Sequence, residues 1–338
     1  MFLQLSTFIS PGRYDPTIVS SPRGIDLYRM IGGNVHRQFA PSLPASLPPG
    51  TLLPRFHGRE VRCVALATFE VPATSRRVEL MFTGAENAVA CLSRVAEDGA
   101  VAMLWEDPQP VAAVKAVAVA RSVGGGATLF AAGVREHLRA WKVVLNEADE
   151  TGDVRARVQA AGAAGTVTDS GGEVRVMDMA VVPLDAEVGT HLGVTCLSDG
   201  WVWVWVYDER AEAFRHVGGT GWHAKCVLSL ASVEAEGRLL ILSGASDGML
   251  AVWDLTALRE MLRSDAGAVV KGGLGEPVLH HRAHLSGVNG LDVVYDGECR
   301  TGCPHFCTLP GLPTFSAEIL PRPPRSSDFV PPRRHRRR

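Results

Sequence analysis

Several features that would point to a membrane protein or a secreted protein are missing from this 338-residue sequence. No uninterrupted apolar run approaches the length that a membrane-spanning helix needs, and residues 1–10 lack the basic start and cleavage pattern of a signal peptide. The formal net charge is −2, so no overall positive field draws the chain to nucleic acid or to an anionic membrane. We therefore expect a cytoplasmic protein without membrane contact, and we expect any contact with RNA to be local.

Catalytic motifs are missing as well. The sequence has no Gly-x-x-x-x-Gly-Lys-Ser/Thr phosphate loop, and the glycine run at 124–126 is too short for one and lacks the lysine. His223 and Asp247 could suggest an acid–base pair, but their places in the repeat described below favour a structural role. We therefore expect no enzyme activity, no catalytic residue and no cofactor.

The cysteine pattern argues against a disulfide-stabilised protein. The total of seven is odd, and four cysteines fall inside strand patterns: Cys63, Cys91, Cys196 and Cys226. A reducing compartment is expected. A second group has spacings similar to a zinc knuckle: Cys299, Cys303, His305 and Cys307. The prolines around this group favour disorder, so we expect no metal site.

What the sequence does contain is a repeated strand–turn–strand pattern. At 243–255 a small-residue strand end is followed by a tight polar turn and by a strand of alternating apolar residues that ends in an aromatic residue. Three degenerate copies precede it, at 83–95, 131–143 and 195–207. The aromatic position is occupied, from the last copy back to the first, by Trp253, Trp205, Trp141 and Ser93. This spacing is typical of β-propeller blades with long loops.

Complete WD repeats carry a buried hydrogen-bond chain from a His before the first strand to a Ser or Thr, a turn Asp and the strand Trp. The last copy holds the whole set: His223, Ser243, Asp247 and Trp253. The copy before it keeps three members and lacks the His: Thr195, Asp199 and Trp205. A buried Asp needs partners for its lone pairs. We interpret these seven residues as a structural blade network.

The pattern also predicts how the chain is organised. Blades are expected at about 57–95, 111–145, 173–207 and 222–255, with a partial fifth at 283–296. Between them, 148–172 and 257–277 are predicted to be loops. The expected fold is all-β, an incomplete WD-repeat β-propeller of about four blades plus the first strand of a fifth. An unfinished ring indicates a fragment or altered isoform of a longer propeller protein, with missing blades supplied by the rest of the chain.

The two ends are predicted to differ from the blades. Residues 1–55 are expected to be irregular, with one hairpin formed by 14–19 and 24–30 and a proline-rich connector at 41–54. Residues 297–338 are predicted to be a disordered Pro/Arg-rich tail. The terminal arginine cluster is either a nuclear-import or phosphate-binding tail or a product of a changed reading frame or splice.

The order of motifs in the second half resembles a known family. It runs through Ser198-Asp199-Gly200, His223-Ala-Lys225-Cys226-Val227-Leu228, Ser246-Asp247-Gly248, Trp253-Asp254-Leu255-Thr256, Ala283-His284 and Gly287-Val288-Asn289. This order is similar to the C-terminal propeller of the WD repeat-containing protein 6 family. The resemblance implies a non-catalytic scaffold that works with a tRNA 2′-O-methyltransferase and, through it, with tRNA in wobble-nucleotide methylation. The alternative is a general interaction scaffold, such as a ubiquitin-ligase substrate receptor or a signalling adaptor.

Two groups of residues could contact partners. Trp201, Trp203 and Trp205 alternate with valines, so they either form a platform that stacks unpaired bases or fill a blade core, and core burial is the favoured interpretation. The charged turn of the second copy offers a candidate partner surface: Arg135, His137 and Arg139. Simple solvation of that turn is the alternative.

Overall fold

Antiparallel strands make up most of the described structure, as the alternating apolar patterns predict. The computed structural model describes residues 5–6, 16–21, 24–31, 34–37, 61–71, 76–95, 101–108, 112–123, 125–134, 137–148, 153–164, 173–265, 268, 273–291, 306–307 and 315–316. No helix in this part of the chain is long and apolar enough to cross a membrane.

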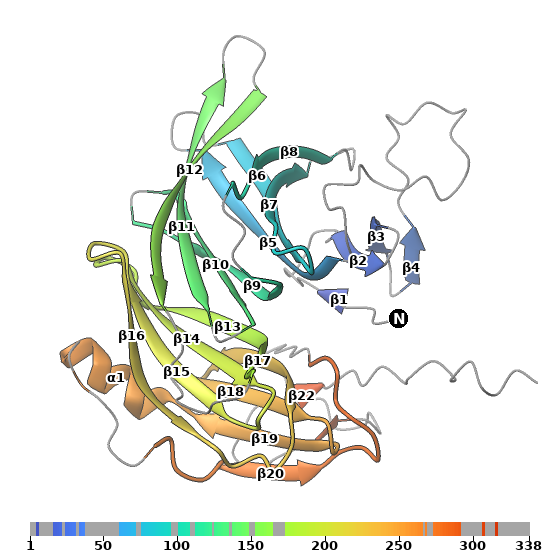
Figure 1. Cartoon of the computed structure of the whole chain (residues 1–338), viewed down its shortest axis with the longest axis vertical. Coiled ribbons are helices and arrows are strands. Elements are labelled where there is room, and N and C mark those ends of the chain that lie inside the picture. Colours follow the sequence, from blue (N-terminus) through green and yellow to red (C-terminus); the bar gives the residue numbers. More distant parts are fainter. Residues whose placement is uncertain are drawn as a thin grey trace, which may run out of the picture.

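Four consecutive sheets of four antiparallel strands stand in a ring and form a four-bladed β-propeller (Figure 1). The first blade contains β5 (Val61–Val71), β6 (Arg76–Ala85), β7 (Ala90–Val95) and β8 (Val101–Glu106). The second contains β9 (Val114–Arg121), β10 (Ala127–Gly133), β11 (Leu138–Ala148) and β12 (Asp153–Ala164). The third contains β13 (Val176–Asp185), β14 (Thr190–Leu197), β15 (Val202–Asp208) and β16 (Ala213–Thr220). The fourth contains β17 (Val227–Ala235), β18 (Arg238–Ala245), β19 (Met249–Asp254) and β20 (Leu279–Arg282).

The first strands of the blades lie innermost. Within each blade the strands neighbour one another in chain order, and the first strands contact one another in sequence: β5 contacts β9, β9 contacts β13, and β13 contacts β17. This is the radial arrangement of a propeller, in which every blade buries both faces against neighbours. The predicted all-β propeller fold is confirmed.

Each blade has a fourth strand that the repeat pattern did not predict. The clearest case is β12, which lies inside the segment 148–172 that we predicted to be a loop; that prediction is wrong. Alanine and glycine in DVRARVQAAGAA have low strand propensity, yet β12 pairs with β11 from Ala148 opposite Asp153 to Leu138 opposite Ala164. The prediction of a loop at 257–277 is also wrong in part, because α1 occupies Thr256–Ser264.

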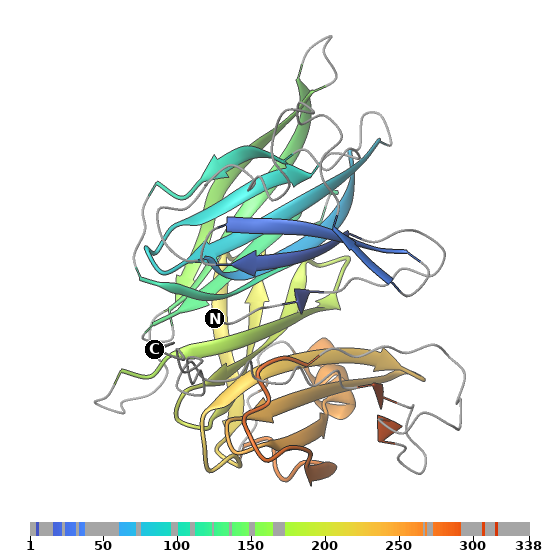
Figure 2. The same cartoon turned by 90° about the vertical axis from the view of Figure 1, so that its right-hand side faces the viewer.

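The N-terminal residues form one further sheet of four strands. It contains β1 (Leu5–Ser6), β2 (Pro16–Ser21), β3 (Gly24–Ile31) and β4 (Asn34–Arg37). β2 and β3 form a hairpin closed by Ser21 opposite Gly24, in the region where a hairpin is predicted. β2 contacts β5, so this sheet lies next to the first blade (Figure 2).

The segment after the fourth blade is described as far as Leu291, and none of residues 283–291 lies in a strand, so the predicted fifth-blade strand is not found there; residues 292–296 lie outside the described residues. Val288 is fully buried and packs against Gly244 of β18. Val114, at the start of β9, packs in the same way against Gly84 of β6. In the predicted tail, two-residue strands pair: β21 (Phe306–Cys307) and β22 (Phe315–Ser316).

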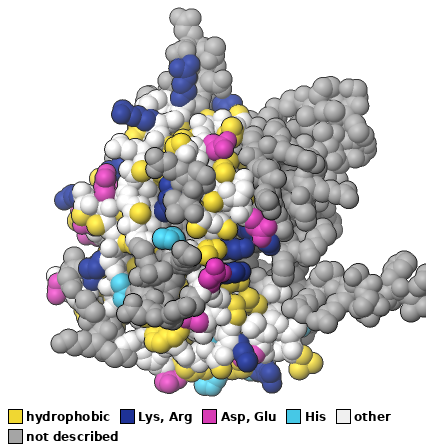
Figure 3. Space-filling view, viewed as in Figure 1, with side chains coloured by type: hydrophobic (Ala, Val, Ile, Leu, Met, Phe, Trp, Pro, Cys, Tyr) yellow, Lys and Arg dark blue, Asp and Glu magenta, His cyan; other side chains and the backbone are white. Residues whose placement is uncertain are grey.

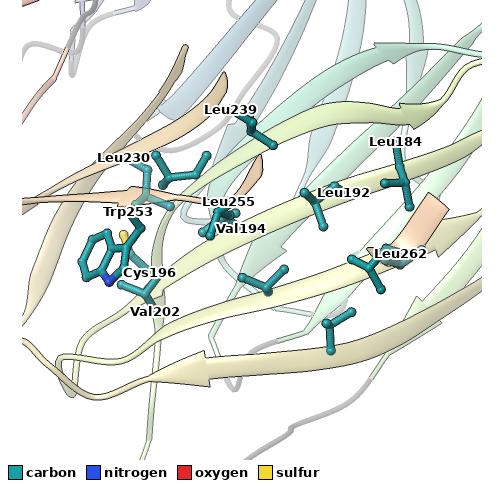
Figure 4. Packing of buried hydrophobic residues seen from close by; sticks show 14 of the residues in the cluster. Leu184, Leu192, Val194, Cys196, Val202, Leu230, Leu239, Trp253, Leu255 and Leu262 are labelled. Atoms are coloured by element: carbon teal, nitrogen blue, oxygen red, sulfur yellow. The ribbon is translucent and has the colours of Figure 1, made fainter. Parts of the chain in front are cut away.

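The hydrophobic cores lie between consecutive blades. Between the third and fourth blades, Leu192, Val194 and Val202 face Trp253 and, on α1, Leu262 (Figure 4). The central strands β10 and β14 are buried along their whole length because a blade covers each of their faces. Burial on both faces of blade strands therefore supplies the main apolar stabilisation of the ring.

Candidate functional site

The fourth blade brings together three of its four predicted network residues. His223 and Ser243 are buried, and the His223 Nε2 lies 2.7 Å from the Ser243 Oγ. The Trp253 ring meets the imidazole edge to face at 5.7 Å between centroids. Burial lowers the pKa of His223 to about 4, against the opposing effect of the Asp247 charge, so the ring is neutral at neutral pH.

Asp247 makes a different hydrogen bond from the one predicted. It is half-buried, and its Oδ1 accepts the N–H of Met249 at 3.1 Å, which closes the turn between β18 and β19. Asp199 does the same in the third blade, where it is exposed and accepts the N–H of Trp201 at 3.1 Å. Both carboxylates therefore act as turn caps, the usual local role of Asp two residues before the donor.

The other two members of the third-blade set line a cavity. Thr195 and Trp205 are buried beside a partly open cavity of about 210 Å³, which the second blade also lines. Met179 pairs with Thr195 in the third blade as Leu230 pairs with Ser243 in the fourth, so these pairs are equivalent positions. By this alignment the sequence position equivalent to His223 is residue 172, a glycine, which lies outside the described residues. The cavity thus adjoins Thr195 and Trp205. These two residues are equivalent to Ser243 and Trp253, which contact the imidazole in the fourth blade.

Two of the three residues of the candidate partner surface are described by the structure. Arg135 lies outside the described residues, and His137 is half-buried. The Arg139 guanidinium pairs with the buried Asp107 at 2.5 Å and lies 4.5 Å from the centroid of the Trp141 ring. Since Asp107 follows the last strand of the first blade, the Arg139–Asp107 ion pair links the first and second blades. This contact favours a structural role for Arg139.

A buried carboxylate between the second and third blades was missed by sequence reasoning. Glu209 is 4% exposed, and its oxygens accept hydrogen bonds from the Ser122 hydroxyl at 2.6 Å, the Thr128 hydroxyl at 2.8 Å and the Val123 N–H at 3.2 Å. The His191 Nε2 lies 2.7 Å from it. Burial raises the pKa of Glu209, but the bonds from His191, Ser122 and Thr128 outweigh it and hold the pKa at about 2.

A second missed carboxylate joins the third blade to the fourth. Asp178 on β13 accepts the N–H of Leu230 on β17 at 2.8 Å and the N–H of Met179 at 2.8 Å. Desolvation by burial raises its pKa to about 6, and these two bonds oppose the rise. Both carboxylates are occupied by internal donors, so the arrangement serves blade assembly and offers no general base to a substrate.

Metal binding finds no support in the described part of the chain. Its residues contain no group of three or more His, Cys, Asp or Glu side chains placed to hold an ion. The zinc-like group at 299–307, which we did not expect to bind metal, lies outside the described residues except for the backbone of β21. Burial raises the pKa of the Cys63 and Cys196 thiols, which keeps them in the neutral form.

The three alternating tryptophans of the third blade have unequal environments. Trp205 is buried, as the favoured interpretation predicted, whereas Trp201 is 38% exposed. The rings of Trp201 and Trp203 stack with 4.8 Å between centroids and 12° between planes, and His216 meets Trp203 edge to face at 4.4 Å. They line an open groove of about 490 Å³, which we call the indole groove. Its described lining residues are Trp201, Trp203, His216, Val217, Gly218, Gly219, Thr220, Gly221, Gly273, Gly275 and Glu276.

Charged side chains are mixed over the surface. In Figure 3 the Lys and Arg side chains are spread among Asp and Glu and do not gather into one large basic patch on the face shown. The ring of blades, the turn-capping aspartates and the His223–Ser243 pair together define a β-propeller of the WD-repeat class.

Comparison with known proteins shows which WD-repeat proteins this chain resembles. No protein-family model matches the chain. It is similar to the tRNA (34-2′-O)-methyltransferase regulator WDR6 of Bos taurus and of Homo sapiens, each 33% identical over 129 residues, which cover 35% of this chain and 11% of the relative. The protein of that name from Mus musculus is 24% identical over 323 residues, covering 78% of this chain and 28% of the relative. The predicted resemblance to the WD repeat-containing protein 6 family is confirmed, and the matched part spans well under half the length of these relatives.

Proposed function

We propose that this chain is a non-catalytic scaffold that works with a tRNA 2′-O-methyltransferase in methylating the wobble nucleotide. The observation that carries the proposal is the similarity to proteins named as regulators of such an enzyme, on a chain folded as a WD-repeat propeller. Blade surfaces and loops of a propeller suit simultaneous contact with several partners. The proposed partners are the methyltransferase protein and, through it, tRNA, in the cytoplasm.

The internal chemistry of the described residues is compatible with a scaffold. The most strongly perturbed carboxylates, Glu209 and Asp178, hold blades together. A methyl-donor site is typically built on a glycine-rich turn after the first strand of a doubly wound parallel sheet, whereas every strand pair described here is antiparallel. In this proposal the methyltransferase supplies the donor site and the chemistry, and the present chain positions it on tRNA.

The test is a purification of the tagged chain from cell extract followed by a reconstituted reaction. We expect a tRNA 2′-O-methyltransferase to co-purify, and we expect methyl transfer to the wobble ribose to rise when the chain is added to that enzyme. The control uses a methyltransferase variant that cannot bind S-adenosylmethionine, with which no transfer is expected. Stoichiometric binding of S-adenosylmethionine to the isolated chain, or co-purification of ubiquitin-ligase or kinase components in place of the methyltransferase, would overturn the proposal.

A further inference from the structure

The indole groove is built by specific features of the third blade. Trp203 lies directly opposite Gly219 in the pairing of β15 with β16, and a Cβ at Gly219 would overlap the indole. A Cβ at Gly221 would lie 2.8 Å from the Trp201 ring. Glycine at these two positions therefore allows both rings to lie across the neighbouring strand.

The second wall comes from the fourth blade's connection. Residues 273–276, which precede β20, lie beside β16, where the Leu274 N–H donates to the Gly219 carbonyl at 3.1 Å. This hydrogen bond holds Gly273 and Gly275 at the groove and brings the exposed carboxylate of Glu276 to its edge. The groove is thus a junction of two blades, with aromatic rings on one side and a carboxylate on the other.

The chemistry of the lining selects a cation. Indole faces carry negative electrostatic potential and attract Arg and Lys side chains. The Glu276 carboxylate adds a full negative charge, and no described lining residue is Lys or Arg. A nucleic-acid segment would bring phosphates to the same place, where this carboxylate repels them. From this charge complementarity we propose that the indole groove receives a basic side chain, arginine foremost, from a segment of a protein partner.

The planar guanidinium fits this groove better than an ammonium group does. It can stack on an aromatic face and, at the same time, donate two parallel hydrogen bonds to a carboxylate. Trp201 supplies the exposed aromatic surface and Glu276 the acceptor. This inference concerns a ligand of the groove and does not depend on which enzyme the scaffold serves.

The test uses the full chain and blocked nine-residue Gly/Ser peptides with a single central Arg, Lys or Gln. Binding is followed by NMR of the indole N–H groups, with Trp201 and Trp203 assigned by replacing each with Phe. We expect the Arg peptide to shift these two signals and to bind roughly tenfold more tightly than the Gln peptide. Trp201→Ala should weaken binding roughly tenfold, with Trp201→Phe intermediate.

Charge variants provide the matched controls. Glu276→Gln should weaken binding of the Arg peptide roughly three- to tenfold and reduce its salt dependence. Glu236→Gln removes the same charge from an exposed turn of the fourth blade and should leave binding unchanged. Lys271 lies outside the described residues, two positions before Gly273. Lys271→Ala should not weaken binding of the Arg peptide.

Three results would overturn the inference. The first is equal affinity for the Arg and Gln peptides. The second is an equal effect of Glu276→Gln and Glu236→Gln. The third is binding of a single-stranded oligouridylate that needs Trp201, strengthens with Glu276→Gln and weakens with Lys271→Ala, because that pattern identifies an RNA site. Circular dichroism and melting of every variant show that the fold is intact, and the exposed positions of Trp201 and Glu276 make that outcome expected.

Discussion

Replacing Glu209 with Gln tests whether a buried carboxylate locks the second blade to the third. The change keeps the size of the side chain but removes the charge and turns one acceptor oxygen into a donor. That donor would face the Ser122 and Thr128 hydroxyls or His191, which now lie 2.6, 2.8 and 2.7 Å from carboxylate oxygens. At least one buried polar group then loses its partner, and such a loss costs about 1–3 kcal/mol.

The pKa of Glu209 provides a second measure of the same interaction. A fall from 4.5 to about 2 in the folded chain corresponds to about 3 kcal/mol of folding stability above pH 4.5. Because the folded-state pKa is depressed, this contribution is complete at neutral pH and is lost as the pH falls from 4.5 towards 2. We expect Glu209→Gln to lower the melting temperature by roughly 6–12 °C at pH 7. We expect that difference to shrink in acid.

The assay is thermal and urea unfolding of parent and variant between pH 3 and 7. Glu212→Gln is the matched control, because Glu212 is an exposed glutamate on the turn between β15 and β16. It should melt within about 1 °C of the parent, since exposed substitutions have small effects. The reasoning is refuted if Glu209→Gln melts with the control, or if its deficit does not depend on pH.

Two further predictions concern the stability contributed by Asp178 and by the His223–Ser243 pair. Burial raises the pKa of Asp178 to about 6, so the ionised form destabilises the fold as the pH rises from 3.8 to about 6. Asp178→Asn keeps an oxygen that can accept the Leu230 N–H. The free energy of unfolding of this variant, relative to the parent, should increase by about 1–3 kcal/mol between pH 3.5 and pH 7, measured by urea titration. A stability difference that does not change with pH would contradict this prediction. Ser243→Ala strands the buried His223 and should cost about 1–3 kcal/mol, whereas Asp247→Ala removes only a half-buried turn cap and should cost less than about 1 kcal/mol. If Asp247→Ala melts at a lower temperature than Ser243→Ala, Asp247 belongs to the buried network.

The strands that were predictable are those that carry a motif or are covered on both faces. β18 and β19 were found from the turn that holds Asp247 and from the alternation that ends at Trp253. β12 was not found, because an outer strand has only to complete the hydrogen bonds of β11, and many sequences do so. Its alanines and glycines therefore resembled a loop.

The same distinction separates the site residues. His223 and Ser243 stand at fixed positions of one repeat, so local spacing predicted their contact. Glu209 bonds to Ser122, which is 87 residues away and in another blade, and no local pattern marks such a pair. Asp178 and Leu230 are 52 residues apart and meet only because β13 and β17 are neighbours in the ring.

The sequence by itself determined the fold class, the position of the central blade strands and the resemblance to a family, because turns and alternating apolar residues are local properties of the chain. Only the tertiary structure decided which charged groups join the blades and which tryptophan is exposed. Trp201 and Trp205 share one strand pattern, yet one ring lies in an open groove and the other against the second blade. The physical reason is that burial and charge pairing depend on which side chains a neighbouring blade presents, and that neighbour is set by the packing of consecutive blades rather than by adjacent residues.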